Sequence, residues 1–358
     1  MRFAIPAAYG LGSFAVLAIY PEQMKWVAFA AVVAIALLDM QWTKPDRIDW
    51  LMLACVGWGA VSLAWTYAFD VGLQFGIVSI AALASVYRLR QSDDPTFACV
   101  AMGIGGAASA AILTNAWLPN ALWSGFGNSG YVAEAMTLSI PFLWVLWRRE
   151  PWMAWGAILL CVPPLVYVIG YTPSMSEWLV IGVWVGIALA LRRWWLGLVW
   201  LAPIGPAAVI GWNHPTIRDH LGTRLELWVN ALFMVKDHPL FGVGAGSFVA
   251  LYPTYKEHHG ALFPFILRTF ESYATEAEAL HNDPLQLLVE QGTIGFGLFA
   301  ALIFFALRMA WRNRRNAVSA AGGMALVTVL AESLIEYPLQ RAGTCFMACV
   351  ALGLATRR

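Results

Sequence analysis

The chain has 358 residues, of which 60% are hydrophobic and 12% are charged, and its mean hydropathy is +0.66. A soluble protein carries about 25% charged residues, so this composition excludes a soluble domain and predicts an all-α polytopic membrane protein. The net charge of +1 points to no charged partner such as nucleic acid.

Apolar runs long enough to cross a bilayer recur along the chain, since about 20 residues of helix span the hydrocarbon core. We expect twelve spanning helices, at residues 3–20, 24–40, 50–68, 71–87, 97–116, 131–147, 152–169, 177–191, 194–211, 284–308, 318–335 and 339–356. The chain is therefore predicted to divide into residues 1–211 with helices 1–9, a large outer loop with an amphipathic helix at 212–283, and residues 284–358 with helices 10–12.

The positions of the basic residues predict the orientation of these helices, because cytoplasmic loops are enriched in lysine and arginine. With the N-terminus in the cytoplasm, most arginines between helices face inward, and the short outer loops hold only Lys25 and Arg341. An even number of helices then places both termini in the cytoplasm and the large loop outside.

The large loop contains every histidine of the chain: His214, His220, His238, His258, His259 and His281. Within it, Thr223 to Glu226 has the pattern of a capping box, which predicts a helix start with Arg224 in the first turn. Apolar residues at helical spacing follow, namely Leu225, Trp228, Leu232 and Val235, up to a stop at Asp237-His238-Pro239. We expect an amphipathic helix on the surface of the bundle or of the membrane.

GVGAGSF at residues 242–248 has three alternate glycines, which indicate tightly turned backbone or a close approach to a ligand. The spacing differs from a dinucleotide-binding fingerprint, and no alternating strand and helix pattern surrounds it. We expect a turn that leads from the surface helix into the next element.

HNDPLQLLVEQG at residues 281–292 marks the start of the tenth spanning helix. Asp283 is predicted as the N-cap, Pro284 as the first helical residue, and Gln286 as the reciprocal capping side chain. His281 would then lie just before a helix N-terminus, which favours anions and disfavours a protonated imidazole. A neutral imidazole is what a general base requires.

Two other chemistries fit this region less well. Glu278 and His281 are three residues apart and could face one way on a helix, but a single Glu-x-x-His is weak evidence for a metal site, and we predict none. A serine hydrolase is disfavoured because the chain has no Gly-x-Ser-x-Gly nucleophile elbow.

Four stretches in the same order resemble the bacterial O-antigen ligase and O-antigen polymerase superfamily. HNDPLQLLVEQGTIG resembles its hallmark of histidine, leucine and Glu-x-Gly before a hydrophobic helix. The other three, each similar to a motif of that superfamily, are WSGFGNSGYVAEAMTLSIPF (123–142), RLELWVNALFMVKDHPLFGVGAGSF (224–248) and ESLIEYPLQRAGTCF (332–346). The resemblance covers roughly residue 125 to the C-terminus.

This resemblance implies a glycosyltransferase in the bacterial inner membrane that works on the periplasmic side without a metal or other cofactor. Such enzymes move a glycan from an undecaprenyl diphosphate carrier to an acceptor hydroxyl. The acceptor is lipid A-core in ligases, a glycan repeat in polymerases and a protein in a third branch, and the sequence leaves these alternatives open.

The chemistry assigns roles to particular residues. His281 is expected to take the acceptor proton or to orient the acceptor, and Arg224 to stabilise the diphosphate leaving group, which needs arginines and backbone amides in the absence of a metal. The further candidates for substrate or diphosphate binding are Arg218, Arg268, Arg341, Asn128, Asn282 and Glu290. For the three arginines a structural ion pair, and for Glu290 a structural hydrogen bond, is an equally reasonable interpretation.

One motif departs from the superfamily. Where its members commonly carry Ser-Arg-Gly before the eighth helix, this chain has Ser174-Met175-Ser176-Glu177, so a basic contact to the diphosphate is missing there. A non-catalytic scaffold with the same fold is therefore an alternative. A transporter or flippase is a further one, although the chain shows neither the repeats nor the broken, charged central helices typical of that class.

Overall fold

The computed structural model describes residues 43–91, 129–149, 151, 155, 182–183, 185–187, 189–190, 192–202, 215–259 and 279–358. The helices within them are α3 (Arg47–Ser62), η1 (Leu63–Trp65), α4 (Phe69–Arg90), α6 (Ser129–Arg149), α9 (Trp194–Leu201), α11 (Pro215–Asp237), α12 (Ser247–His259), α14 (Asp283–Arg312), α15 (Ala317–Glu332), η2 (Pro338–Gln340) and α16 (Ala342–Ala355). No strand occurs among these residues, so the predicted all-α fold is confirmed.

Among the described residues, three helical segments are long and apolar enough to cross a membrane: Arg47–Trp65, Phe69–Arg90 and Asp283–Arg312. Ala317–Glu332 and Thr344–Ala355 are shorter apolar helices. The predicted runs 50–68, 71–87, 131–147, 284–308, 318–335 and 339–356 all fall on described helices. The runs at 3–20, 24–40 and 97–116 lie outside the described residues, so the total of twelve stays a prediction.

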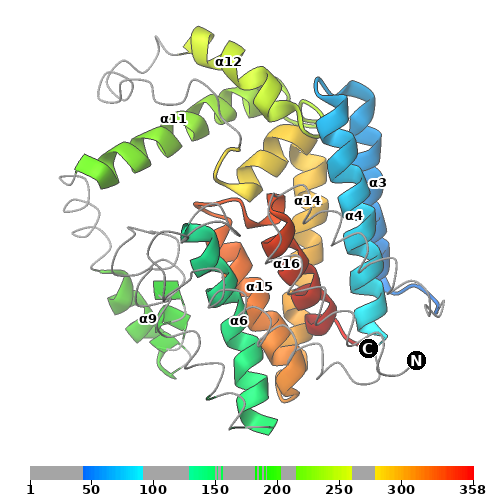
Figure 1. Ribbon diagram of the computed structural model, residues 1–358, viewed down its shortest axis with the longest axis vertical. Helices are drawn as coiled ribbons and strands as arrows, with labels where there is room; N and C mark the ends of the chain where they lie inside the picture. The colour runs from blue at the N-terminus through cyan, green and yellow to red at the C-terminus, as the bar shows by residue number, and fades with distance from the viewer. Residues whose placement is uncertain are drawn as a thin grey trace, which may run out of the picture.

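The long helices run roughly along one direction, and α11 lies across one end of them (Figure 1). At the centre, α16 packs between α15 and α4. Small residues allow α15 and α16 to approach closely, since a Cβ on Gly322 would lie 2.4 Å from the Ala355 backbone nitrogen. Ala321, Ala325 and Ala351 are also completely buried. Close packing through small residues is typical of helices within a membrane.

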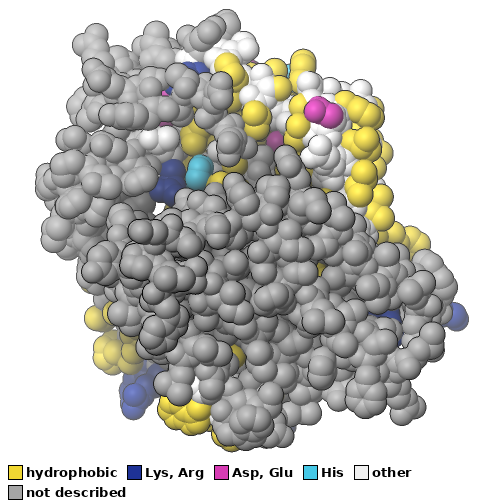
Figure 2. Space-filling model, viewed as in Figure 1, with side chains coloured by type: hydrophobic (Ala, Val, Ile, Leu, Met, Phe, Trp, Pro, Cys, Tyr) yellow, Lys and Arg dark blue, Asp and Glu magenta, His cyan; other side chains and the backbone are white. Residues whose placement is uncertain are grey.

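The outer sides of α3 and α4 are apolar and exposed. Trp50, Leu53, Phe69, Ile77 and Ile80 each leave more than two-fifths of their surface uncovered. Figure 2 shows apolar side chains collected on the side of the molecule where Figure 1 places α3 and α4. An exposed apolar face of this extent is typical of contact with lipid, which agrees with the membrane-spanning character expected from the composition.

The surface helix of the large loop is present but longer than predicted. α11 begins at Pro215, so Thr223 lies inside it and the predicted capping box is wrong. The Glu226 carboxylate instead lies 3.3 Å from the Lys256 ammonium of α12. The helix ends at Asp237, as Pro239 predicted.

The buried face of α11 agrees with the prediction in part. Trp228 and Val235 pack against a core formed by Leu227, Ala231 and Met234, whereas Leu232 is 55% exposed. These three residues pack with Phe248 and Leu280 in a second hydrophobic core at this end of the molecule. Helical spacing therefore identified part of the covered face, and the fully buried residues lie beside it.

The three alternate glycines form the predicted tight turn. Gly242, Gly244 and Gly246 have φ values of 70°, 98° and 78°, a backbone conformation that L side chains rarely adopt. The turn pairs with a kink in α14, where Val243 N donates to the Val289 carbonyl and Gly244 N to the Glu290 carbonyl. The close neighbours of the glycines are thus other backbone segments of the chain.

Candidate functional site

His281 sits in unusual backbone at the start of α14. Its φ of +52° makes it the one non-glycine among the described residues in the left-handed region. Both neighbours are fixed by side chains: the Trp228 indole donates to the Leu280 carbonyl at 3.1 Å, and Asn282 Nδ2 donates to the Leu334 carbonyl at 2.9 Å. Strained backbone held in this way clusters at functional sites.

α14 begins one residue earlier than predicted. Asn282, and not Asp283, is the N-cap of α14, with its Oδ1 accepting from Leu285 N at 2.9 Å. The predicted reciprocal role of Gln286 is also wrong, because its Oε1 accepts from Leu280 N at 3.0 Å and from Gln340 Nε2 at 2.8 Å.

Asp283 connects α14 to the segment between α15 and α16. Its carboxylate is buried and accepts hydrogen bonds from Ser333 Oγ at 3.1 Å, Leu339 N at 2.9 Å and Gln340 Nε2 at 3.1 Å. Asp283 is the first residue of α14, and its carboxylate makes these contacts while Asn282 caps the helix. It holds the 333–340 segment against the residues around His281.

Glu336, in that segment, joins the two residues that the sequence singled out for catalysis. His281 Nδ1 lies 3.0 Å from Glu336 Oε2, and the Arg224 guanidinium forms an ion pair with Glu336 Oε1. We name His281, Glu336 and Arg224 the His281 site. The His281 side chain is 34% exposed, whereas those of Glu336 and Arg224 are largely covered.

The charge state of Glu336 determines which nitrogen of the His281 imidazole carries the hydrogen. Burial alone raises the pKa of the Glu336 carboxyl, but the hydrogen bond with His281 and the positive charge of Arg224 outweigh it and lower the pKa below its usual value. An ionised carboxylate can only accept, so His281 Nδ1 carries the hydrogen and donates it. The lone pair of a neutral imidazole is then on Nε2.

Tyr337 and Arg341 extend the contacts of the His281 site. The Tyr337 ring meets the His281 ring edge-on at 4.7 Å, and the Arg341 guanidinium lies 4.5 Å from the centre of the Tyr337 ring. Arg341 is itself buried and donates to Glu134 Oε1 of α6 at 2.6 Å. For Arg341 the structure therefore shows an ion pair, which was the structural alternative to a substrate contact.

Glu290 likewise makes structural hydrogen bonds. Its carboxylate accepts from Gly246 N at 2.9 Å, from Phe248 N at 3.4 Å and from Gln286 Nε2 at 3.2 Å. It thus caps the N-terminus of α12 and joins the glycine turn to α14. No contact joins it to the His281 site among the described residues.

Three further predicted residues are not placed by the structure. Asn128 and Arg268 lie outside the described residues, and so does the Ser174–Glu177 stretch. Arg218 lies in α11, two turns before Arg224, but its side chain is outside the described set.

Glu336 is the site residue that sequence reasoning missed. The stretch Glu336-Tyr337-Pro338-Leu339 was recognised as a superfamily motif, yet no role was given to its acid. The available signal was an acid directly before Tyr-Pro in a second motif of the same superfamily, since a carboxylate can accept a hydrogen bond from a histidine. The sequence did not show that the two segments touch.

No group of three or more histidine, cysteine, aspartate or glutamate side chains suited to holding a metal ion occurs in the part of the chain that the structure describes. The His281 site offers instead one imidazole, one carboxylate and one guanidinium. This combination can accept a proton and stabilise a developing negative charge.

Comparisons with known proteins support the resemblance seen in the sequence. Residues 114–300, more than half of the chain, match the family described as O-antigen ligase. An O-antigen ligase of Pseudomonas aeruginosa is 24% identical over 334 residues, which cover 87% of this chain and 71% of that protein. The matched residues include Arg224 and His281. The chain therefore belongs to the O-antigen ligase family, whose members are membrane glycosyltransferases, as its motifs predicted.

Proposed function

We propose that the protein transfers a glycan from an undecaprenyl diphosphate carrier to an acceptor hydroxyl at the periplasmic face of the inner membrane, without a metal. Lipid A-core is the acceptor that family membership favours. The observation that carries the proposal is the contact of Glu336 with both His281 and Arg224 at the start of a spanning helix.

In the proposed reaction His281 Nε2 takes the proton of the acceptor hydroxyl. The hydroxyl oxygen attacks the anomeric carbon of the donor glycan, and the bond from that carbon to the diphosphate oxygen breaks. The leaving diphosphate keeps the electron pair, and the imidazolium later gives its proton to water. Glu336 stabilises the imidazolium while it exists, in the way that a buried acid supports the histidine of a hydrolase triad.

Arg224 has groups available for the leaving diphosphate. One terminal nitrogen pairs with Glu336, and the Arg224 side chain remains 13% exposed. A guanidinium has five N–H donors, so the same side chain can hold Glu336 and donate to an anion. We propose that Arg224 does both, and that the amides at the start of α14 add to the positive field.

The acceptor is tested by deleting the gene in its native bacterium and analysing surface lipopolysaccharide. The proposal expects loss of all glycan-capped lipopolysaccharide, with complete glycans accumulating on the carrier lipid. Capping by one repeat only would show a polymerase instead. Normal lipopolysaccharide with a missing protein-bound glycan would show the protein-glycosylating branch.

A further inference from the structure

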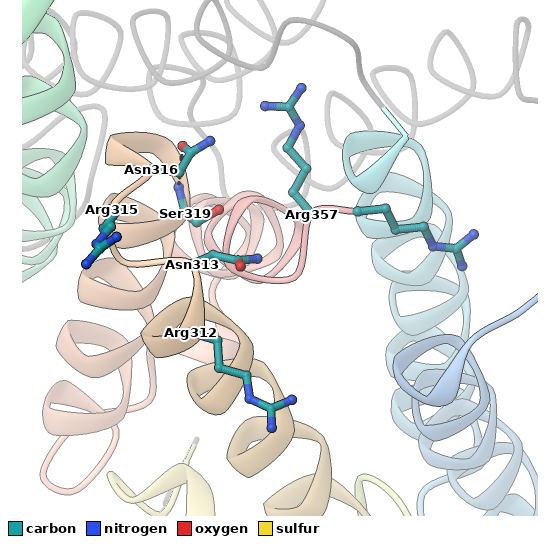
Figure 3. Close-up of a pocket in the computed structure, with 7 residues that line it drawn as sticks. Arg312, Asn313, Arg315, Asn316, Ser319 and Arg357 are labelled. Carbon is teal, nitrogen blue, oxygen red and sulfur yellow. Dashed lines mark hydrogen bonds between the residues drawn. The ribbon is translucent and has the colours of Figure 1, made fainter.

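An arginine-lined pocket lies at the end of α14 opposite the His281 site. Its lining comes from the end of α14, the turn into α15, the start of α15 and the last two residues: Arg312, Asn313, Arg315, Asn316, Ser319, Arg357 and Arg358. The cavity volume is about 400 Å³, and Figure 3 shows Asn313 and Ser319 centrally with arginines around them. The proposed glycan transfer uses none of these residues.

The pocket has a positive charge that the described residues do not neutralise. Its lining contains no aspartate or glutamate. Arg358 is paired with Asp46 and Asp49, but Arg312 and Arg315 form no ion pair within the described part of the chain. Guanidinium groups in this situation suit the oxygens of a phosphate group.

The floor of the pocket carries polar groups that suit the same ligand. Ser319 is only 3% exposed and lines the pocket, and its backbone nitrogen donates to Asn316 Oδ1. Asn316 caps α15, so the positive end of that helix also faces this region. Hydroxyl and amide groups beside arginines that have no ion pair suit the oxygens of a bound anion.

The position of the pocket at the end of α14, near the membrane surface, favours a lipid headgroup as its ligand. Trp311, one residue before Arg312, is 55% exposed, and the Arg314 guanidinium lies 4.8 Å from the centre of its ring. Exposed tryptophan at the end of a spanning helix is typical of the interface between membrane and water. Arginines are generally enriched on the cytoplasmic side of membrane proteins, and this explains why several occur at this end of α14. It does not explain why they surround a polar cavity.

We propose that this pocket binds the phosphate of an anionic membrane lipid, at the membrane face opposite to the His281 site. Arg312 and Arg315 supply the charge and Ser319 the hydrogen bond. The same phosphate chemistry could be supplied by a soluble phosphate ion, and the experiment below separates the two sources. Basic pockets at the ends of membrane helices are known to take such headgroups.

Native mass spectrometry of the full-length protein in detergent tests the proposal, with phosphatidylglycerol, phosphatidylcholine or inorganic phosphate added separately. The test variant is Arg312→Gln/Arg315→Gln. The matched control is Arg308→Gln/Arg314→Gln, which removes two charges from the same region but none from the pocket lining. Ser319→Ala removes the pocket hydroxyl without a change of charge, and circular dichroism checks that each variant is folded.

We expect wild type to retain phosphatidylglycerol in preference to phosphatidylcholine. The pocket double variant should weaken this binding at least about tenfold and Ser319→Ala about threefold, whereas the control pair should change it less than about threefold. Equal losses in both arginine pairs would overturn the proposal in favour of a diffuse charged surface. Retention of inorganic phosphate without any preference for the anionic lipid would identify a soluble anion as the ligand and overturn the lipid assignment.

Discussion

A single carboxylate, Glu336, accounts for the arrangement of the candidate active site. It accepts from His281 Nδ1 at 3.0 Å and pairs with Arg224, so removal of its charge affects both partners. The imidazole would lose the group that fixes its tautomer, and the guanidinium would lose the group that holds its position.

We expect Glu336→Gln to lower the rate of glycan transfer by about 10²-fold, because general base catalysis contributes about 10²–10⁴-fold and depends on the correct tautomer. Glu336→Asp should retain more activity. Transfer is measured on surface glycan at matched protein level. Asp237→Asn, a change to an exposed acid at the end of α11, is the control and should behave as wild type. Full activity in Glu336→Gln would remove Glu336 from the mechanism.

Glu336 also makes stability depend on pH. A carboxyl with a lowered pKa in the folded chain contributes stability that is fully present above its usual value of 4.5 and is lost as pH falls through the lowered value. The excess of the unfolding temperature of wild type over that of Glu336→Gln should thus shrink as pH falls below about 4.5. An excess that grows as pH falls below about 4.5 would have the opposite sign to the one expected.

The sequence identified two members of the site but not their connection. His281 and Arg224 each lie in a motif with a local rationale, a helix start in one case and a surface helix in the other. Glu336 is 55 residues from His281 and 112 from Arg224, and local capping and periodicity carry no information about contacts over such separations.

For the helices, too, the sequence pattern predicts where long apolar segments lie, whereas tertiary contacts determine where some helices begin. Long apolar runs predicted α3, α4 and α14 within a few residues, since hydropathy depends only on composition. The starts of α11 and α14 were predicted wrongly because the polar side chains that looked like caps have tertiary partners. Glu226 pairs with Lys256, and Asp283 binds the 333–340 segment.

The kink of α14 at Gly292 is the point where the glycine turn fits against the helix. Gly292 has φ 66° and ψ −173°, and a Cβ there would lie 2.2 Å from the Leu240 carbonyl oxygen. We expect Gly292→Ala to reduce the free energy of unfolding by at least about 1–3 kcal/mol, from backbone strain alone.

Thermal unfolding in detergent measures this effect, and Gly297→Ala is the matched control on the same helix. A Cβ on Gly297 meets no atom within 4 Å, so alanine there should be neutral or stabilising by up to about 1 kcal/mol. Equal stability of both variants would show that the turn does not depend on the kink.

At the scale of the whole molecule, a buried ion cluster fastens the end opposite to the His281 site. Arg90 at the end of α4 is 1% exposed, contacts Asp46 at 2.5 Å and Asp49 at the start of α3, and donates to the Thr356 carbonyl at 2.9 Å. One side chain thus connects α3, α4 and the residues after α16.

Arg90→Gln should cost about 1–3 kcal/mol of stability, because Asp46 and Asp49 lose their buried partner and keep only Arg358. The measurement is again thermal unfolding in detergent. Arg47→Gln, which removes an exposed cation 4.9 Å from the centre of the Phe305 ring, should cost less than about 1 kcal/mol. A loss in Arg90→Gln no larger than in this control would mean that the cluster does not hold the helices together.

The central claim is that His281 performs the chemistry of glycan transfer with the help of Arg224. The most direct test is to complement the deletion strain with His281→Ala, Arg224→Ala and His238→Ala at equal protein levels and to compare glycan-capped lipopolysaccharide. His238 is an exposed histidine of the same loop, outside the site. We predict that the first two variants lose capping and that His238→Ala retains it. Wild-type capping with His281→Ala would contradict the account.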